Sequence, residues 1–258
     1  MISSLTFGWM ALHGFKANNI AFIVPACNEA DFIADTVAAI VGAAKAIERE
    51  ISYELVVVDD GSEDQTAEIA EQHGAKVVRV SHRNIAATRN AGAAATNGDL
   101  LIFVDADTRP NAGLVEQTLE AFDAGANWGT ALAEPWDSHP WWVKVGLPLF
   151  NWYYVRWRQC AYGFYFVVKR EAFDRAKGFS TTSDEGEDMA LSKLLVSDHG
   201  PPTVFKTRVA TSARKAGSFG IAYHFKMLWL GLRHGDSMYT HPSIKDYRDG
   251  RQRLRQQD

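Results

Sequence analysis

The chain has 258 residues and a formal net charge of −4 at pH 7. This acidic balance argues against a general nucleic-acid binder, and no nucleic-acid partner is expected. Hydrophobic residues make up 47% of the sequence and charged residues 22%, which argues against gross disorder and is enough for a sizeable core. The length accommodates one large α/β domain or two small ones.

The two cysteines, Cys27 and Cys160, do not have the spacing of metal ligands. Free thiols are typical of a reducing compartment. No stretch contains about 18 uninterrupted apolar residues, which is the length that a helix needs to cross a bilayer. We therefore expect a cytoplasmic protein without a transmembrane helix.

Strands and helices are expected to alternate through the first half of the chain. Short apolar runs predict buried strands at 20–24, 55–58, 76–80 and 100–105. Amphipathic or alanine-rich segments predict the helices between them, at 32–41, 66–72 and 84–96. This alternation predicts a doubly wound, mostly parallel sheet with flanking helices.

Polar clusters follow three of these strands, namely Asn28-Glu29, Asp59-Asp60 and Asp105 with Asp107. Because parallel strands end at one edge of a sheet, and ligands bind there, the three clusters predict a site. An extended spacing would point Asp105 and Asp107 to the same side. Two close carboxylates favour a hard cation such as Mg²⁺ or Mn²⁺, although an isolated pair could equally be two solvated turn residues.

The glycine fingerprint of dinucleotide-binding folds and the P-loop motif are both missing from this sequence. A nucleotide would therefore be bound in another way, with carboxylates on the base and ribose and a metal ion on the diphosphate.

The second half predicts a helix at 111–123, strands at 130–134 and 163–170, and an acidic turn that opens a helix near Glu187. The segment 135–157 is rich in aromatic residues mixed with Lys144 and Arg156. Such a segment suits a membrane interface or a sugar platform, and core packing of a helix is the open alternative. The apolar segment 219–233 could cover the site or touch a membrane.

Four short segments occur in order: IVPACNE at 23–29, VVDDGS at 57–62, RNAG at 89–92 and FVDAD at 103–107. Together they closely resemble the family 2 glycosyltransferases. The resemblance implies a GT-A fold, with a single domain over 1–258 that divides into a nucleotide-binding half (18–110), an acceptor and catalytic half (111–217) and a C-terminal helix and tail (218–258). It also implies inverting transfer of a sugar from a UDP- or GDP-linked donor to an acceptor hydroxyl.

By this resemblance, the base pocket is lined by Pro25, Ala26, and Asn28 or Glu29, while Asp59 contacts the base. Glu29 could equally have a structural role, as a carboxylate at a helix start where the helix dipole stabilises negative charge. Cys27 stands where the family usually has tyrosine.

The resemblance also places Arg89 near the nucleotide, Asp105 at the ribose or metal, and Asp107 on the metal itself. The segment TSARK at 211–215 resembles one that some members carry, and it would turn Arg214 toward the donor diphosphate, which a guanidinium can bind bidentately. His224 is a further candidate metal ligand by analogy, with a structural histidine as the alternative.

In the resembled family, the acidic pair at Glu187-Asp188 supplies the catalytic base, for which Asp188 is our choice and Glu187 the alternate. A sugar hydroxyl is a poor nucleophile, so a carboxylate must take its proton during attack, while the metal ion stabilises the leaving diphosphate. A plain helix cap is the alternative for these carboxylates.

Two other functions are open at this point. Phosphotransferases of the haloacid-dehalogenase type also have D-x-D after a strand. Two residues after the second aspartate they carry Thr or Val, whereas this chain has Arg109. A non-catalytic module could bind a partner through the tryptophan-rich segment. The Q-x-x-R-W pattern of processive synthases is absent, so we expect no polymer extrusion.

The aromatic and basic segments suggest a lipid-linked or membrane-proximal acceptor and a peripheral position at the inner face of the membrane.

Overall fold

The computed structural model describes residues 15–183, 186–214, 226, 229, 230 and 233. Most of the expected C-terminal helix and tail, including His224, lies outside these residues. Among the described residues, no helix is both long enough and apolar enough to span a membrane.

The described part of the chain forms a seven-stranded sheet in the order β3-β2-β1-β4-β8-β6-β9. The strands are β1 (Asn19–Ala26), β2 (Ser52–Asp60), β3 (Lys76–Val80), β4 (Leu100–Val104), β6 (Trp128–Thr130), β8 (Tyr165–Lys169) and β9 (Thr203–Val204). Only β8 runs antiparallel to its neighbours, β4 and β6, within this sheet. The mostly parallel α/β architecture expected from the sequence is confirmed.

A small second sheet has the order β5-β10-β7 and contains β5 (Thr108–Arg109), β7 (Ala133–Pro135) and β10 (Val209–Thr211). The single strand expected at 130–134 is therefore wrong. The chain leaves the large sheet after β6, where the Thr130 hydroxyl donates to the Tyr165 carbonyl oxygen, and it enters the small sheet at Ala133.

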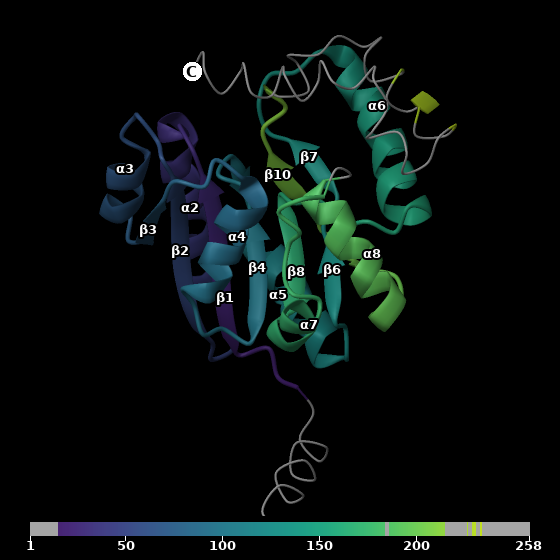
Figure 1. Cartoon of the computed structure of the whole chain (residues 1–258), viewed down its shortest axis with the longest axis horizontal. Helices are drawn as coiled ribbons and strands as arrows, with labels where there is room; N and C mark the ends of the chain where they lie inside the picture. Colours follow the sequence, from purple (N-terminus) through teal and green to yellow (C-terminus); the bar gives the residue numbers. More distant parts are fainter. Residues whose placement is uncertain (1–14, 184–185, 215–225, 227–228, 231–232, 234–258) are drawn as a thin grey trace, which may run out of the picture.

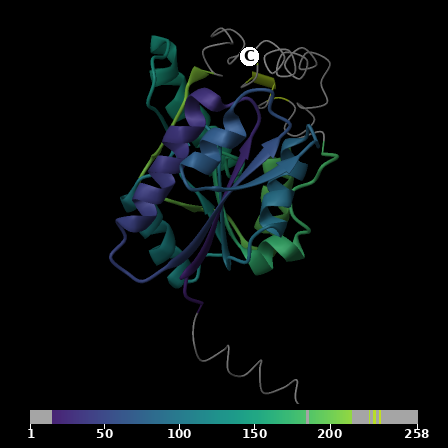
Figure 2. The ribbon, with the colours of Figure 1, turned by 90° about the vertical axis from the view of Figure 1, so that its left-hand side faces the viewer.

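Helices cover both faces of the large sheet (Figure 2). One face carries α2 (Ala30–Lys45), α3 (Thr66–Gln72) and α5 (Ala112–Asp123), and the other carries α4 (Ile85–Ala94), α7 (Arg170–Arg175) and α8 (Glu187–His199). Successive strand residues alternate between the two cores, so that Phe22 packs with α2 and α5 while Ile23 packs toward α4. Both faces are buried, which explains why the strands read as continuous apolar runs.

The helix α6 (Trp141–Asn151) continues directly into the π-helical segment η1 (Trp152–Trp157). In Figure 1, α6 lies at the edge of the molecule on the side of β6 and β7, at the opposite end from α3 and β3.

The strand ends coincide as the sequence predicts. Ala26 at the end of β1 is in register with Asp59 near the end of β2, and the neighbouring β4 ends at Val104. Three polar segments therefore begin at one edge of the sheet, and this edge holds the candidate site.

Candidate active site

The loop after β1 is joined to the loop after β2. Asn28 has a φ of 54°, a left-handed conformation that asparagine tolerates better than most residues. Its N–H donates to Ser62 Oγ at 2.9 Å, and its Oδ1 accepts from the Glu63 N–H at 2.8 Å. The Ser62 hydroxyl in turn donates to the buried carboxylate of Asp59. The two predicted base-pocket residues, Asn28 and Asp59, are thus brought together through Ser62.

Pro25 and Ala26 are the last two residues of β1, and both are buried. They are in register with Val58 and Asp59 of the parallel strand β2. They therefore set where the loop that carries Asn28 begins.

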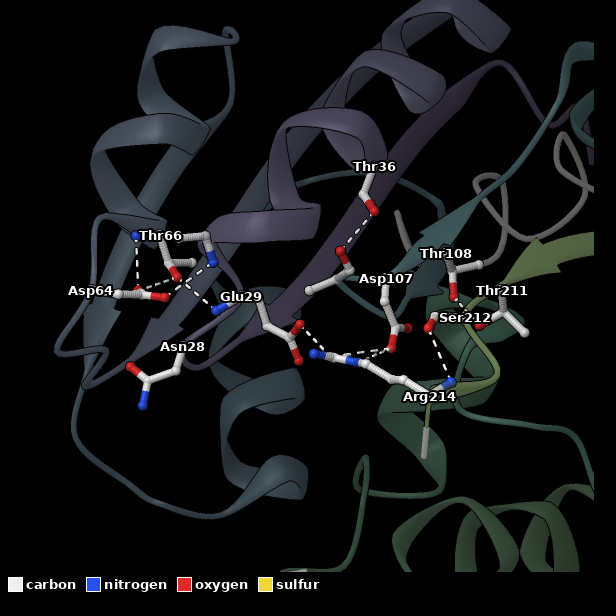
Figure 3. A network of polar contacts seen from close by, with 12 residues as sticks. Asn28, Glu29, Thr36, Asp64, Thr66, Asp107, Thr108, Thr211, Ser212 and Arg214 are labelled. Atoms are coloured by element: carbon white, nitrogen blue, oxygen red, sulfur yellow. Dashed lines mark hydrogen bonds and ion pairs between the residues drawn. The ribbon is translucent and has the colours of Figure 1, made fainter. Parts of the chain in front are cut away.

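The Arg214 guanidinium joins two of the predicted site carboxylates (Figure 3). It donates to Glu29 Oε2, and its Nε donates to Asp107 Oδ2 at 3.3 Å. Its Cζ lies 4.3 Å from the centroid of the Phe32 ring, a cation–π contact. Burial alone would lower the pKa of Arg214, but Glu29 and Asp107 outweigh it and raise that pKa.

Glu29 precedes the first residue of α2, yet its side chain makes no hydrogen bond that caps this helix. The carboxylate instead reaches Arg214, which comes from the far end of the described chain. The ion pair with Arg214 therefore favours a role for Glu29 in the candidate site over a purely structural role at the start of α2.

The small sheet carries Arg214 to this position. The Ser212 N–H donates to the Asp107 carbonyl oxygen at 3.1 Å, and the hydroxyls of Thr108 and Thr211 are 2.8 Å apart. The Asp137 carboxylate accepts from the Ser212 hydroxyl and from the Ala213 N–H. Asp137, which the sequence did not single out, therefore holds the segment that presents Arg214.

A second guanidinium, that of Arg89 on α4, is buried between two carboxylates. Its Nη2 is 2.9 Å from Asp105 Oδ1, and its Nη1 is 2.6 Å from Glu187 Oε1. Burial would lower the pKa of Arg89, but the charges of Asp105, Glu187 and Asp188 raise it far above its usual range. Arg89 therefore stays charged and links the end of β4 to the start of α8.

Asp105 and Asp107 do not have the extended spacing expected from the sequence. The strand β4 ends at Val104, and the Thr108 N–H donates to the Asp105 carbonyl oxygen at 3.1 Å, which closes a turn. As a result the two carboxylates contact different arginines, Asp105 with Arg89 and Asp107 with Arg214. The turn is the point where the two charged clusters meet.

The two candidate bases differ in their surroundings. Glu187 is engaged by Arg89, whereas Asp188 Oδ2 accepts from the Gly163 N–H at 3.3 Å and its Oδ1 accepts from the Met189 N–H at 2.8 Å. The residue that precedes α8 is Gly186, so Asp188 lies inside the first turn and is not its N-cap. The Asp188 carboxylate therefore faces the backbone of Gly163, and both carboxylates act electrostatically on Arg89.

Asp60 belongs to the polar cluster after β2, but it serves the backbone. Its carboxylate accepts from the N–H groups of His82, Arg83 and Asn84 at 2.6, 2.8 and 3.1 Å, and from the Thr88 hydroxyl. Burial opposes ionisation, but these hydrogen bonds prevail and the pKa of Asp60 is lowered. Asp60 thus anchors the start of α4, the helix that presents Arg89.

The RNAG segment has a packing role beyond Arg89. Asn90 clamps the backbone of Phe179, donating to its carbonyl oxygen at 2.8 Å and accepting from its N–H at 2.9 Å. A Cβ at Gly92 would lie 2.3 Å from Ile23 Cγ2, so only glycine lets α4 approach β1 this closely. The segment therefore fixes the position of α4 on the sheet, and with it the position of Arg89.

Gly163 is expected to tolerate no side chain. A Cβ added there would lie 2.3 Å from Arg89 Nη2, an atom held by the Asp105 ion pair. Gly163→Ala should lower the free energy of unfolding by about 1–3 kcal/mol, the usual cost of overpacking, in a urea titration. Gly42→Ala in α2 is the control, because a Cβ there meets nothing within 4 Å and should be neutral or stabilising. Equal effects of the two substitutions would contradict this account of Gly163.

The sequence matches the family model described as glycosyl transferase family 2 over residues 21–180, more than half of the chain. The chain belongs to glycosyl transferase family 2. The matched range contains the loops after β1 and β2, Arg89, Asp105 and Asp107, and it ends before Asp188 and Arg214.

Two relatives with curated names illustrate this family 2 membership. An uncharacterized glycosyltransferase of Mycobacterium tuberculosis is 28% identical over 138 residues, 52% of this chain and 58% of that protein. The undecaprenyl-phosphate 4-deoxy-4-formamido-L-arabinose transferase of Edwardsiella ictaluri is 32% identical over 113 residues, 41% of this chain and 34% of that protein. The chain thus spans little more than half the length of the first of these relatives and about a third of the second.

A solved structure supports the fold of this family 2 member. The mannosyltransferase PcManGT of Pyrobaculum calidifontis, in complex with GDP-Man and Mn²⁺, superposes with a TM-score of 0.61 at 18% identity over 90% of this chain and 72% of that one. The fold is GT-A, as the sequence resemblance implies.

Proposed function

We propose that the chain transfers a sugar from a UDP- or GDP-linked donor to an acceptor hydroxyl, with inversion at the anomeric carbon. One observation carries this proposal. The turn from Asp105 to Thr108 joins two carboxylate–guanidinium clusters, and one of them contains Asp188 at the start of α8. Family membership and the GT-A fold argue against the haloacid-dehalogenase alternative.

The donor base would be bound by the joined loops after β1 and β2. Asn28 and Asp59 are held together by Ser62, so a base that contacts one of them is also close to the other. Carboxylate and amide groups that are fixed in this way can read the hydrogen-bonding edge of a base. The complex of PcManGT with GDP-Man supports a nucleotide-sugar donor.

The donor set suits a hard divalent cation that takes part of its coordination from the substrate. Asp107 and Asp105 offer carboxylate oxygens, which Mg²⁺ and Mn²⁺ prefer. Among the described residues, no three His, Cys, Asp or Glu side chains converge on a metal position. Diphosphate oxygens and water would therefore complete the coordination, and the bound cation would neutralise the leaving diphosphate. His224, the further candidate ligand, is outside the described residues.

Arg214 would assist from the other side of Asp107. Its guanidinium is paired with Glu29 and Asp107, and phosphate oxygens can replace such carboxylate partners in bidentate geometry. Arg89, which is buried and charged, would keep Asp105 and Glu187 in place near the nucleotide.

Asp188 would act as the general base. As the acceptor oxygen attacks the anomeric carbon, its proton passes to the Asp188 carboxylate and the bond to the diphosphate oxygen breaks. Attack opposite the leaving group gives the inverted product. The Gly163 N–H holds the carboxylate in position without neutralising it.

For the acceptor we propose a lipid-linked or membrane-proximal hydroxyl compound, reached from the cytoplasmic side of a membrane. The relative named an undecaprenyl-phosphate transferase supports a lipid-linked substrate class. The exposed tryptophans of α6 and η1 support it from the structure.

A thermal-shift screen with UDP, GDP, CDP and dTDP sugars, each with Mn²⁺ or with EDTA, tests the donor site. At about 100 times Kd a ligand adds about 2.7 kcal/mol to stability, so one nucleotide should raise Tm by about 5–10 °C in Mn²⁺ and by less in EDTA. Asp107→Asn should remove the difference between Mn²⁺ and EDTA, whereas Asp174→Asn on the exposed side of α7 should keep it. Binding of no nucleotide would contradict the proposal and favour the non-catalytic module.

A further inference from the structure

The chain from α6 to η1 exposes an unusual set of large apolar side chains. Five of them have 44–73% of their surface exposed: Trp141, Leu149, Phe150, Trp152 and Trp157. Exposed positions recur in helical steps of three and four, at 141, 144, 148 and 152. We call the side formed by Trp141, Lys144 and Trp152, with the following Trp157, the aromatic face; Leu149 and Phe150 are exposed on other sides of α6. Scattered exposed apolar residues are ordinary, but three exposed tryptophans along one segment indicate a binding function.

The π-helical turn extends the aromatic face beyond α6. A π-helix pairs residue i with residue i+5, so its side chains at this spacing lie above one another. The rings of Trp152 and Trp157 are accordingly 6.4 Å apart between centroids, and both are exposed. Tyr153, Tyr154 and Val155 are buried, and the Tyr153 ring packs edge-on against Trp157 at 5.4 Å between centroids. The change of helix type therefore places a third tryptophan next to the second on the same surface.

The charge of this segment is opposite to that of the chain. Residues 138–170 contain no Asp or Glu, although the chain as a whole carries a net charge of −4. Within this stretch Lys144 and Arg156 are exposed beside the tryptophans, and Arg158 is half-buried. Tryptophans that are exposed next to Lys and Arg, without neighbouring carboxylates, are typical of surfaces that bind anionic lipid headgroups.

Stacked rings lead from the end of α6 toward the candidate active site. The exposed Phe150 stacks on Tyr154 at 5.7 Å, Tyr154 on Tyr162 at 4.6 Å, and Tyr162 on Phe164 at 4.6 Å, measured between ring centroids. Gly163, whose N–H donates to Asp188, stands between Tyr162 and Phe164 in the sequence. The helix that carries the aromatic face is therefore connected to the candidate base by direct packing over a few residues.

We propose that the aromatic face docks the enzyme on an anionic lipid bilayer, with the active site next to the membrane surface. The proposal rests on the proposed function for the position of the acceptor, but the docking itself depends only on the exposed residues. The tryptophan rings would enter the interfacial region, while Lys144 and Arg156 would contact anionic headgroups. An acceptor anchored in the bilayer would then meet Asp188 without leaving the membrane.

The test is co-sedimentation with vesicles of phosphatidylcholine alone or with 30% phosphatidylglycerol. The full chain should bind the anionic vesicles at least tenfold more tightly than the neutral ones. The triple substitution Trp141→Ser, Trp152→Ser, Trp157→Ser should weaken this binding at least tenfold, and so should Lys144→Glu with Arg156→Glu. Leu194→Ser and Lys45→Glu, which remove exposed residues elsewhere, are the matched controls and should leave binding unchanged.

Absence of binding to the anionic vesicles, or unchanged binding by both sets of variants, would overturn the docking proposal. The nucleotide-dependent rise in Tm, measured on the same variants, reports folding and the donor site independently. Vesicle binding without any nucleotide-dependent rise in Tm would support docking and contradict the transferase proposal. A nucleotide-dependent rise in Tm without vesicle binding would support the donor site and contradict docking.

Discussion

Replacing Asp188 with Asn is expected to lower kcat by about 10²–10⁴-fold, the usual contribution of a general base. The amide keeps one oxygen for the Gly163 N–H, and its NH2 group replaces the oxygen that accepts from the Met189 N–H, so one hydrogen bond in the first turn of α8 is lost. What is lost is the negative charge that takes the proton of the acceptor. The donor site proposed above lies in the loops after β1 and β2, so the nucleotide-dependent rise in Tm should persist. Release of nucleoside diphosphate in the presence of acceptor measures the effect.

Two variants on the same helix sharpen this test. Asp198→Asn removes an exposed carboxylate at the far end of α8 and should leave kcat unchanged. Glu187→Gln removes the alternate base, and it should affect stability because Arg89 loses a partner. Wild-type kcat in Asp188→Asn together with a large loss in Glu187→Gln would exchange the roles of the two residues.

The edge of the sheet that holds the site could be predicted from the sequence because its signals are local. A fully buried strand such as β4 is a continuous apolar run, and the polar residue that follows marks its end. The expected bounds of α3 and β3, at 66–72 and 76–80, also agree with the structure. The clustering of Asn28, Asp59 and Asp105 at one edge follows from the parallel order of the strands.

The partners of the charged residues could not be predicted because they depend on distant segments. Arg214 and Glu29 are 185 residues apart, and Arg89 and Glu187 are 98 residues apart. No local pattern indicates that Asp105 and Asp107 choose different arginines, since the choice follows from the turn at Asp105 and from the small sheet that carries Arg214. Asp60 is a similar case, because a carboxylate that anchors a helix looks the same in sequence as one that binds a ligand.

The aromatic segment 135–157 combines the two structures that its sequence allows. It contributes both to core packing and to an exposed surface. Tyr153 and Tyr154 are buried, while Trp152 and Trp157 are exposed. The π-helical turn sets this division, and an expected α-helical period of 3.6 residues does not reveal it.

Arg89→Met is expected to lower the free energy of unfolding by about 3–5 kcal/mol, the usual cost of removing one partner from a buried ion pair. Methionine fills part of the volume, but it leaves Asp105 and Glu187 close together, with Asp188 nearby and no cation between them. A typical domain has only about 5–15 kcal/mol of stability, so this loss is large but compatible with a folded variant. Urea titration of the wild type and the variant measures it.

A second arginine provides the comparison that separates burial from charge. Arg175 also forms an ion pair, with Glu171 one helical turn away, but both side chains are more than half exposed. Because water screens such a pair, Arg175→Met should change stability far less than Arg89→Met. Arg89→Lys should fall between the two, since it keeps the charge but cannot contact two carboxylates with a planar fork. Similar losses for Arg89→Met and Arg175→Met would show that Arg89 does not hold the end of β4 and the start of α8 together. Asp188 would then owe its position to contacts other than the Arg89 cluster, among them the Gly163 N–H.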